Sequence, residues 1–187
     1  MSILFERIIE MPNYCDCTVC IYCPDEEDNN LAEISSFLAT PEKMFSFDKV
    51  IPYPEKYRLL DESAMNWERK QKALKDAGTI DHINWSERPA DGYNHGGYEW
   101  CIENWGTKWN ALRPTIEENN GYRVVYHFKT AWNPPTPVIL QLSKLYPENE
   151  ITLEYYEMGM QFCGSMRVKN GIILDEAESK YYGIKGG

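Results

Sequence analysis

Hydrophobic and polar residues alternate near the start of the chain. Between Tyr14 and Cys23 one face carries Cys15, Cys17, Val19, Ile21 and Cys23, and the polar residues fall on the other face. A period of two predicts a strand with one buried face. The next apolar residues, Leu31, Ile34, Phe37 and Leu38, have helical spacing and follow Asp and Asn residues that can cap a helix. The pattern therefore predicts a strand followed by a helix.

The middle of the chain is more polar. "FSFDKVIPYPEKY" at 45–57 predicts a short extended piece, because its prolines break regular elements. Residues 61–78 predict an exposed helix that closes on Gly78, and the polar residues 79–97 predict a loop. The span of about 55–97 is thus predicted to be an insertion between core elements, with freedom to vary in sequence.

Regular patterns resume after the insertion. Residues 98–105 predict a short helix ended by Gly106, and residues 107–112 predict a strand leaving that cap. "GYRVVYHFKT" alternates like a strand, with His127 on its polar face. Thr136 is predicted to cap a helix whose first residue is Pro137. Residues 151–176 predict two or three strands joined at Gly159 and at "KNG".

Without the insertion, the predicted order of elements is β-α-β-β-α-β plus a trailing hairpin. This order predicts an α+β fold of the ferredoxin-like split βαβ type, an antiparallel sheet with two helices on one face. We expect residues 1–187 to form a single ferredoxin-like domain with a helical and loop insertion at about 55–97 and a C-terminal hairpin.

Composition narrows the class of protein. The chain has 187 residues, of which 43% are hydrophobic, which is enough for a packed core, and its net charge is −10. This acidity disfavours nucleic acid as a partner, because phosphate binding needs a basic face. No apolar run approaches the ~20 residues of a spanning helix, and the N-terminus lacks the features of a signal peptide. We therefore expect no membrane association and a cytoplasmic location.

Four cysteines within nine positions raise the question of a metal. Cys15, Cys17, Cys20 and Cys23 have a spacing that resembles a ligand set. In a strand, however, same-face neighbours lie about 6.5–7 Å apart along the backbone, whereas thiolates that share one zinc lie about 3.7–3.8 Å apart. We interpret three of them as buried core residues and Cys20 as facing away, and we predict neither a metal nor a cofactor.

Catalytic motifs are absent from the sequence. The pattern contains no H-E-x-x-H, G-x-S-x-G, P-loop or Rossmann glycines. A small enzyme site made of His95, Glu99 and Cys101 can be drawn, yet no spacing requires it. We therefore assign no catalytic residue and favour a protein that is not an enzyme.

Five further segments, occurring in a fixed order, resemble one family. They are "PNYC" at 12–15, "FDKVIPYP" at 47–54, "WCIENWGTKWNA" at 100–111, "TAWNPPTPVI" at 130–139 and "YEMGMQFCG" at 156–164. Together they resemble the YubB-type ferredoxin-like-domain family, which is found on conjugative plasmids and in phages. The resemblance spans most of the chain outside 55–97 and implies a ferredoxin-like fold and a mobile-element origin, but no reaction. Tyr14 stands where the family often has tryptophan, and Cys17 where it often has asparagine.

The tryptophan-rich motifs provide the candidate binding residues. Tryptophan and tyrosine give a large contact area at low entropic cost, so these motifs fit either an aromatic core or a recognition groove. Lys108 is the residue of first interest, because it offers charge to an anionic ligand unless it simply points into water. The candidates are Trp100, Asn104, Trp105, Thr107, Lys108, Trp109, Trp132, Arg123 and His127.

Three functions are compatible with these patterns. The favoured one is a non-enzymatic binding protein of a phage or plasmid, whose acidic surface occupies and inhibits a host or element-encoded partner in defence or DNA processing. The first alternative is a nucleic-acid or nucleotide-binding module that uses the open sheet face. The second alternative is the small His/Glu/Cys enzyme.

Overall fold

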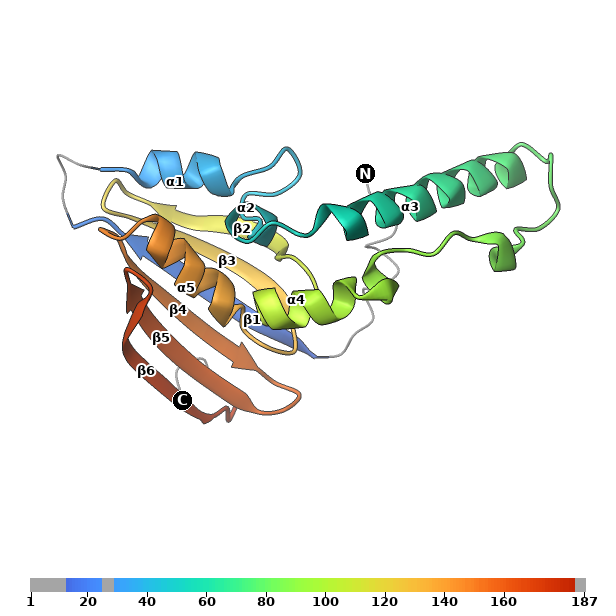
Figure 1. The fold of residues 1–187 in the computed structure, drawn as a ribbon. Coiled ribbons are helices and arrows are strands. Elements are labelled where there is room, and N and C mark those ends of the chain that lie inside the picture. The colour runs from blue at the N-terminus through green and yellow to red at the C-terminus, as the bar shows by residue number, and fades with distance from the viewer. Residues whose placement is uncertain (1–12, 25–28, 184–187) are drawn as a thin grey trace. The chain divides into compact units, whose positions relative to one another are not determined.

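The computed structural model of the chain describes residues 13–24 and 29–183. These residues form two compact units (Figure 1). The insertion unit comprises residues 53–100, and the sheet unit comprises the described residues of 13–52 and 101–183. Residues 55–97, the predicted insertion, fall inside the insertion unit. Within the described residues, no helix is both long and apolar enough to span a bilayer.

All strands of the described chain join one antiparallel sheet in the sheet unit. The strands are β1 (Tyr14–Tyr22), β2 (Leu112–Asn119), β3 (Arg123–Ala131), β4 (Glu150–Glu157), β5 (Phe162–Lys169) and β6 (Ile172–Lys180). Their order is β2-β3-β1-β4-β5-β6, and every neighbouring pair is antiparallel. Because β1 lies between β3 and β4, the connections cross as in a split βαβ unit. The predicted ferredoxin-like α+β fold is confirmed, and β5 and β6 extend its sheet.

The core lies on the face of the sheet that the alternation predicts. Cys15, Cys17, Val19 and Ile21 of β1 are fully buried. On the neighbouring strands β3 and β4 the buried side chains also follow a period of two. Helices α1 (Leu31–Leu38) and α5 (Thr136–Leu145) cover this face (Figure 1), and the Tyr126 hydroxyl of β3 donates a hydrogen bond to the Ser35 hydroxyl of α1 over 2.9 Å.

The prediction of an extended piece at 45–57 is wrong at both ends. Residues Phe47–Val50 form the short helix α2, whose Phe47 and Val50 are buried. Helix α3 (Glu55–Asp76) begins six residues before the predicted start at 61. Pro54 stands just before α3, a place where its missing N–H removes no helical hydrogen bond. Pro52 and Pro54 therefore separate helix α2 from helix α3.

Two other predicted boundaries also differ from the structure. Residues 107–110 form a turn, and β2 begins only at Leu112. The side chains of Thr107 and Asn110 bond backbone groups of other segments, which favours a turn over a ladder. Helix α5 starts at Thr136 with Pro135 as its cap, one residue earlier than predicted.

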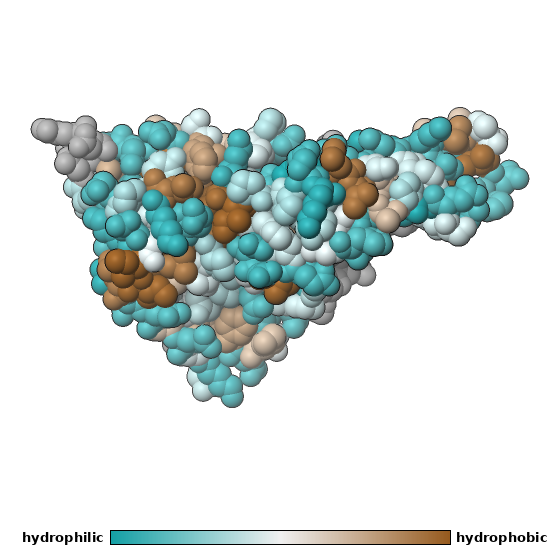
Figure 2. Space-filling model, in the orientation of Figure 1, coloured by the Kyte–Doolittle hydropathy of each residue, from teal (hydrophilic) through white to brown (hydrophobic). Residues whose placement is uncertain are grey.

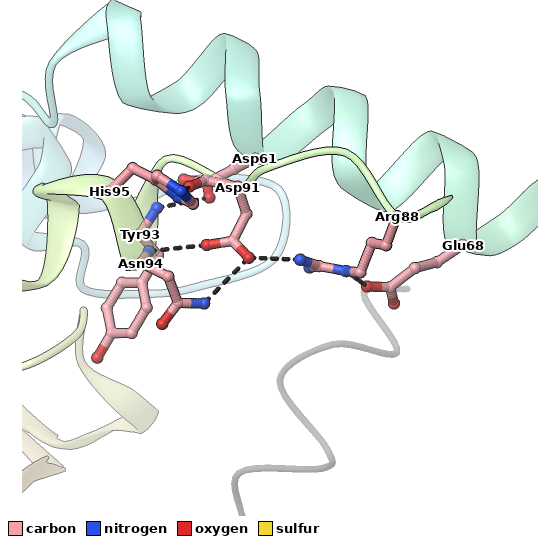
Figure 3. A network of polar contacts seen from close by, with 7 residues as sticks. All are labelled: Asp61, Glu68, Arg88, Asp91, Tyr93, Asn94 and His95. Atoms are coloured by element: carbon pink, nitrogen blue, oxygen red, sulfur yellow. Dashed lines mark hydrogen bonds and ion pairs between the residues drawn. The ribbon is translucent and has the colours of Figure 1, made fainter. Parts of the chain in front are cut away.

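A network of polar contacts fastens the loop of the insertion unit to α3 (Figure 3). Arg88 contacts Glu68 of α3 at 2.6 Å and Asp91 at 2.5 Å. Asp91 also accepts hydrogen bonds from the backbone and side chain of Asn94. Burial by itself would raise the pKa of Asp91, but the bonds from Arg88 and Asn94 outweigh it and hold the pKa below its usual value. These contacts therefore hold the loop against α3 within the insertion unit.

Candidate functional site

Three of the four clustered cysteines are buried in the core of the sheet unit. Cys15, Cys17 and Cys23 are buried, as predicted, and Cys20 is half-buried on the opposite face. The spacing argument against a metal does not hold for the first pair, because the Cys15 and Cys17 sulfurs lie only 4.0 Å apart when the two side chains converge. Burial raises the pKa of the Cys17 thiol well above its ordinary value, so this thiol is held neutral. Within the described residues, no group of three His, Cys, Asp or Glu side chains could hold a metal ion.

The segment 105–111 joins helix α4 (Gly97–Trp105) to β2 and contains the most specific sequence motif. Trp105 is buried, and its indole N–H donates to the carbonyl of Ile51 over 2.9 Å. Gly106 has a φ of +77°, and a Cβ at this position would lie 2.9 Å from the Pro137 ring. The two tryptophan-containing motifs therefore meet at Gly106, where only glycine combines the left-handed backbone with this close approach.

Thr107 and Asn110 anchor the turn to the rest of the sheet unit. The fully buried Thr107 hydroxyl donates to the Ala131 carbonyl over 2.9 Å and accepts from the Ala131 N–H over 3.0 Å. The Asn110 side-chain oxygen accepts from the N–H of Phe47 over 2.8 Å, and its amide donates to the Ser46 hydroxyl. The polar atoms of Thr107, one of the candidate binding residues, and of its neighbour Asn110 are thus occupied within the fold.

Lys108 lies between two tryptophan rings at the end of β3. Its ammonium nitrogen is 3.0 Å from the centroid of the Trp132 ring and 5.6 Å from the centroid of the Trp109 ring. We call Lys108, Trp109 and Trp132 the Lys108 cluster. Only 7% of Lys108 and 6% of Trp109 are exposed, so most of the lysine side chain is covered by its neighbours. Burial lowers the pKa of Lys108.

The backbone holds Trp132 in an unusual conformation. Its φ is +69°, in the left-handed region that large side chains rarely adopt. Its N–H donates to the carbonyl of Asn13 over 3.2 Å, which ties the end of β3 to the residue before β1. The left-handed backbone of Trp132 and its hydrogen bond to Asn13 together fix where its ring lies over Lys108.

Arg123 and His127 do not belong to the Lys108 cluster, because they face the other side of the sheet. Arg123 pairs with Glu118 over 2.7 Å, and His127 lies 3.5 Å from the carboxylate of Asp16. Lys129 lies 3.3 Å from the same carboxylate, and only 6% of Asp16 is exposed. The basic groups of this face are thus neutralised by carboxylates, which does not favour phosphate binding there.

Two candidates remain on α4. Trp100 belongs to the insertion unit, where its ring packs edge-on against Tyr53 at 5.6 Å between centroids. Asn104 is half-buried near the end of α4 in the sheet unit. The cation–π contacts that define the Lys108 cluster include neither of them.

The proposed His95, Glu99 and Cys101 enzyme site gains no support from the local geometry. Gly96 has a φ of +108° and separates the turn of His95 from α4, as the glycines predicted. Glu99 and Cys101 are two positions apart on α4 and therefore project in nearly opposite directions. Glu99 is exposed, whereas Cys101 is buried. The enzyme hypothesis stays a prediction.

The sequence patterns did not reveal the exposed surface of strand β6. All nine residues of the outer strand β6 are exposed, including Asp175, Glu176 and Glu178. The sequence "IILDEAESK" contained a signal for this exposure. Its apolar residues come first and its acidic residues follow, whereas a half-buried strand would alternate apolar and polar residues.

The sheet order, with α1 and α5 on one face, defines a ferredoxin-like α+β protein. Residues 104–182 match the family model described as "Ferredoxin-like domain in Api92-like protein", which agrees with the ferredoxin-like sheet of this part of the chain. A similar solved structure is that of protein api92 from Yersinia pseudotuberculosis, with a TM-score of 0.55 and 10% sequence identity, covering 92% of this chain and 99% of that chain. At this identity the similarity concerns the fold alone. The comparison with curated proteins gave no match.

Proposed function

We propose that this chain is a non-enzymatic binding protein of a phage or plasmid that acts in the cytoplasm of a host bacterium. Its partner is a basic protein of host defence or DNA processing, which it occupies through the acidic outer strand β6. The observation that carries the proposal is the complete exposure of β6, combined with a net charge of −10. The mobile-element origin rests on the resemblance of the sequence motifs to the YubB-type family.

Strand β6 has the geometry of a docking edge. Among the described residues it has a sheet neighbour, β5, on one side only. The backbone groups of an outer strand can accept an extended segment of a partner as a further strand. Glu176 and Glu178 lie opposite Met166 and Gly164 and share one face, whereas Asp175 lies opposite Arg167 on the other. Both faces of such a partner strand would therefore meet carboxylates.

The first part of β6 adds apolar surface to this charge. Ile172, Ile173 and Leu174 are 61%, 42% and 48% exposed. Figure 2 shows hydrophobic side chains gathered at the end of the sheet where β5 turns into β6. A segment with basic residues next to apolar ones complements this edge.

The plain alternative is that the acidic residues only protect an exposed edge. Natural sheets use charges and bulges to prevent edge-to-edge aggregation, and the β5–β6 ladder does shift register between Arg167 and Val168. Under this interpretation the acids of β6 keep the protein monomeric and recognise no partner. Reversing the charge of β6 distinguishes the two interpretations, because it removes a partner under the first and causes aggregation under the second.

The test compares two variants with the same change in net charge. In Glu176→Lys/Glu178→Lys the charge on β6 is reversed, whereas in Glu62→Lys/Asp76→Lys it is reversed on the exposed surface of α3. Cross-linked complexes are purified from bacterial lysate and identified by mass spectrometry. We expect the unmodified protein and the α3 variant to retain one basic protein, cross-linked to β6, that the β6 variant loses.

Two outcomes would contradict the proposal. Equal retention by both variants would show that β6 does not carry binding, and equal loss would show a nonspecific effect of charge. Aggregation of the β6 variant without loss of a basic partner from the unmodified protein would support the protective interpretation.

A further inference from the structure

Two hydrogen-bond donors of the Lys108 cluster, the buried indole N–H of Trp109 and the ammonium of Lys108, have no acceptor in the described part of the chain. The Trp109 indole nitrogen is fully buried and makes no hydrogen bond there. The Lys108 ammonium contacts the faces of Trp109 and Trp132, and no described carboxylate or carbonyl lies within bonding distance of it. Both donors belong to adjacent residues of one turn.

Such an arrangement is unfavourable for folding alone. A buried polar group without a partner loses its hydrogen bonds to water, and a buried charge loses more. The contact with Trp132 offsets part of this loss through the cation–π interaction, but an aromatic face accepts no strong hydrogen bond. The indole N–H of Trp109 receives no compensation in the described residues.

The rest of the turn shows which parts of the motif the fold needs. Trp105, Thr107 and Asn110 each direct their polar atoms to a partner inside the sheet unit. Lys108 and Trp109, which lie between them, do not. The turn is thus held rigidly by its flanking residues while its two central residues keep their donors available.

We propose that the Lys108 cluster is a binding site for an anionic oxygen group, a carboxylate or a phosphate, that accepts hydrogen bonds from the Lys108 ammonium and the Trp109 indole N–H. Trp132 lies over the ammonium and holds it in place. The chemistry excludes a cationic ligand, because Lys108 itself occupies the aromatic faces that would bind one. Two donors and no acceptor require an acceptor-rich ligand.

This site is separate from the surface in the proposed function. Trp132 follows β3, and in the sheet order β3 is separated from β6 by β1, β4 and β5. Failure of partner binding at β6 would therefore leave the anion site intact. Conversely, loss of the anion site would leave the edge strand unchanged.

The site can be tested by nitrogen-15 NMR of the indole N–H groups. The Trp109 signal is assigned as the one that disappears in Trp109→Phe. The full chain is titrated separately with inorganic phosphate and with acetate, and with chloride at matched ionic strength as the control. The Trp105 indole, which already donates to Ile51, is an internal reference that we expect not to move.

We expect a saturable shift of the Trp109 signal with phosphate, acetate or both, but not with chloride. Which anion binds more tightly identifies whether the natural group is a phosphate or a carboxylate. Lys108→Met should weaken binding by about tenfold or more, and Lys108→Arg should preserve part of it, because a charged donor is retained.

The result that would overturn the proposal is measured on the unmodified protein, so it does not depend on whether the variants fold. If neither oxyanion shifts the Trp109 signal beyond the effect of chloride, the cluster is a buried cation–π contact and nothing more. An equal shift of the Trp105 and Trp109 signals would likewise indicate a general salt effect.

Discussion

Gly92 lies where the loop of the insertion unit crosses helix α3. A Cβ at this position would lie 2.1 Å from the carbonyl oxygen of Tyr57, which is a backbone atom and cannot turn aside. Gly97 is similarly close, with its Cβ position 2.0 Å from the Tyr53 hydroxyl. The glycines of "DGYNHGG" thus permit contact between the loop and α3, and they complement the polar network of Arg88 and Asp91.

Gly92→Ala is therefore expected to destabilise the insertion unit by about 3 kcal/mol, the upper range for overpacking. Its own φ of −69° is ordinary, so the loss arises from packing alone. Gly78→Ala in the same unit is the matched control, since Gly78 has a φ of +68° but open space around it. We expect this control to lose only about 1–2 kcal/mol.

Amide hydrogen exchange measures this effect locally. Exchange in α3 should accelerate strongly in Gly92→Ala and moderately in Gly78→Ala, whereas the amides of β1 should change little. Unchanged protection of α3 in Gly92→Ala would show that the loop does not need to approach the helix this closely.

The turn after α4 fastens three elements to one another. Thr107 bonds both backbone groups of Ala131 at the end of β3, and Asn110 bonds the start of α2. Both Thr107 and Ala131 are almost completely buried. Side-chain hydrogen bonds therefore take the place of backbone ladder bonds in this turn, and β2 starts only at Leu112.

Thr107→Val should lower the free energy of unfolding of the sheet unit by about 2 kcal/mol, because the Ala131 N–H and carbonyl lose a buried partner. Thr115→Val is the control: its exposed hydroxyl lies 3.4 Å from the His127 carbonyl, and we expect a change within about 0.5 kcal/mol. Urea unfolding monitored on the sheet unit compares them. Equal midpoints for the two variants would contradict a structural role of Thr107.

The stability of the folded chain in alkali depends on a half-buried lysine. Lys43 donates to the Ala111 carbonyl over 2.6 Å, and burial lowers its pKa to about 8. An unfolded lysine stays protonated up to about pH 10.4, so between these values the unfolded chain holds the extra proton. The contribution of Lys43 to stability therefore rises with pH through this window. Burial, with Glu178 and Glu176 nearby, raises the pKa of Tyr155 to about 12, which has the opposite effect above pH ~10.

Lys43→Met is expected to remove the rise in stability between about pH 8 and pH 10, which amounts to about 1–3 kcal/mol. The exposed Lys49 of α2 gives the matched control Lys49→Met, which should keep the rise. Urea unfolding at a series of pH values measures both. A rise of the same size in Lys43→Met would assign the effect to other groups.

Alternation was the most informative signal in the sequence. It located β1, β3 and the buried face of the sheet, because a period of two places every second side chain in the core whatever the neighbouring strand. Helix α1 and the end of α3 at Gly78 followed from spacing and from a glycine. These features depend on residues close together in the chain.

The errors occurred where distant residues decide the outcome. The short helix α2 and the turn at 107–110 depend on each other through Asn110 and Phe47, which are 63 positions apart. The convergence of the Cys15 and Cys17 sulfurs depends on side-chain rotamers that backbone spacing does not specify. Local patterns contain no information on either.

The sequence by itself therefore determined the order of strands and helices, the ferredoxin-like fold class and the acidity of the molecule, since each follows from local periodicity or from composition. Only the tertiary structure decided the state of Lys108. Its burial requires Trp132, which lies 24 positions later and reaches the lysine because β3 ends beside the turn. Likewise, the position of β6 at the edge of the sheet, where all nine of its residues are exposed, is set by the pairing of the other strands.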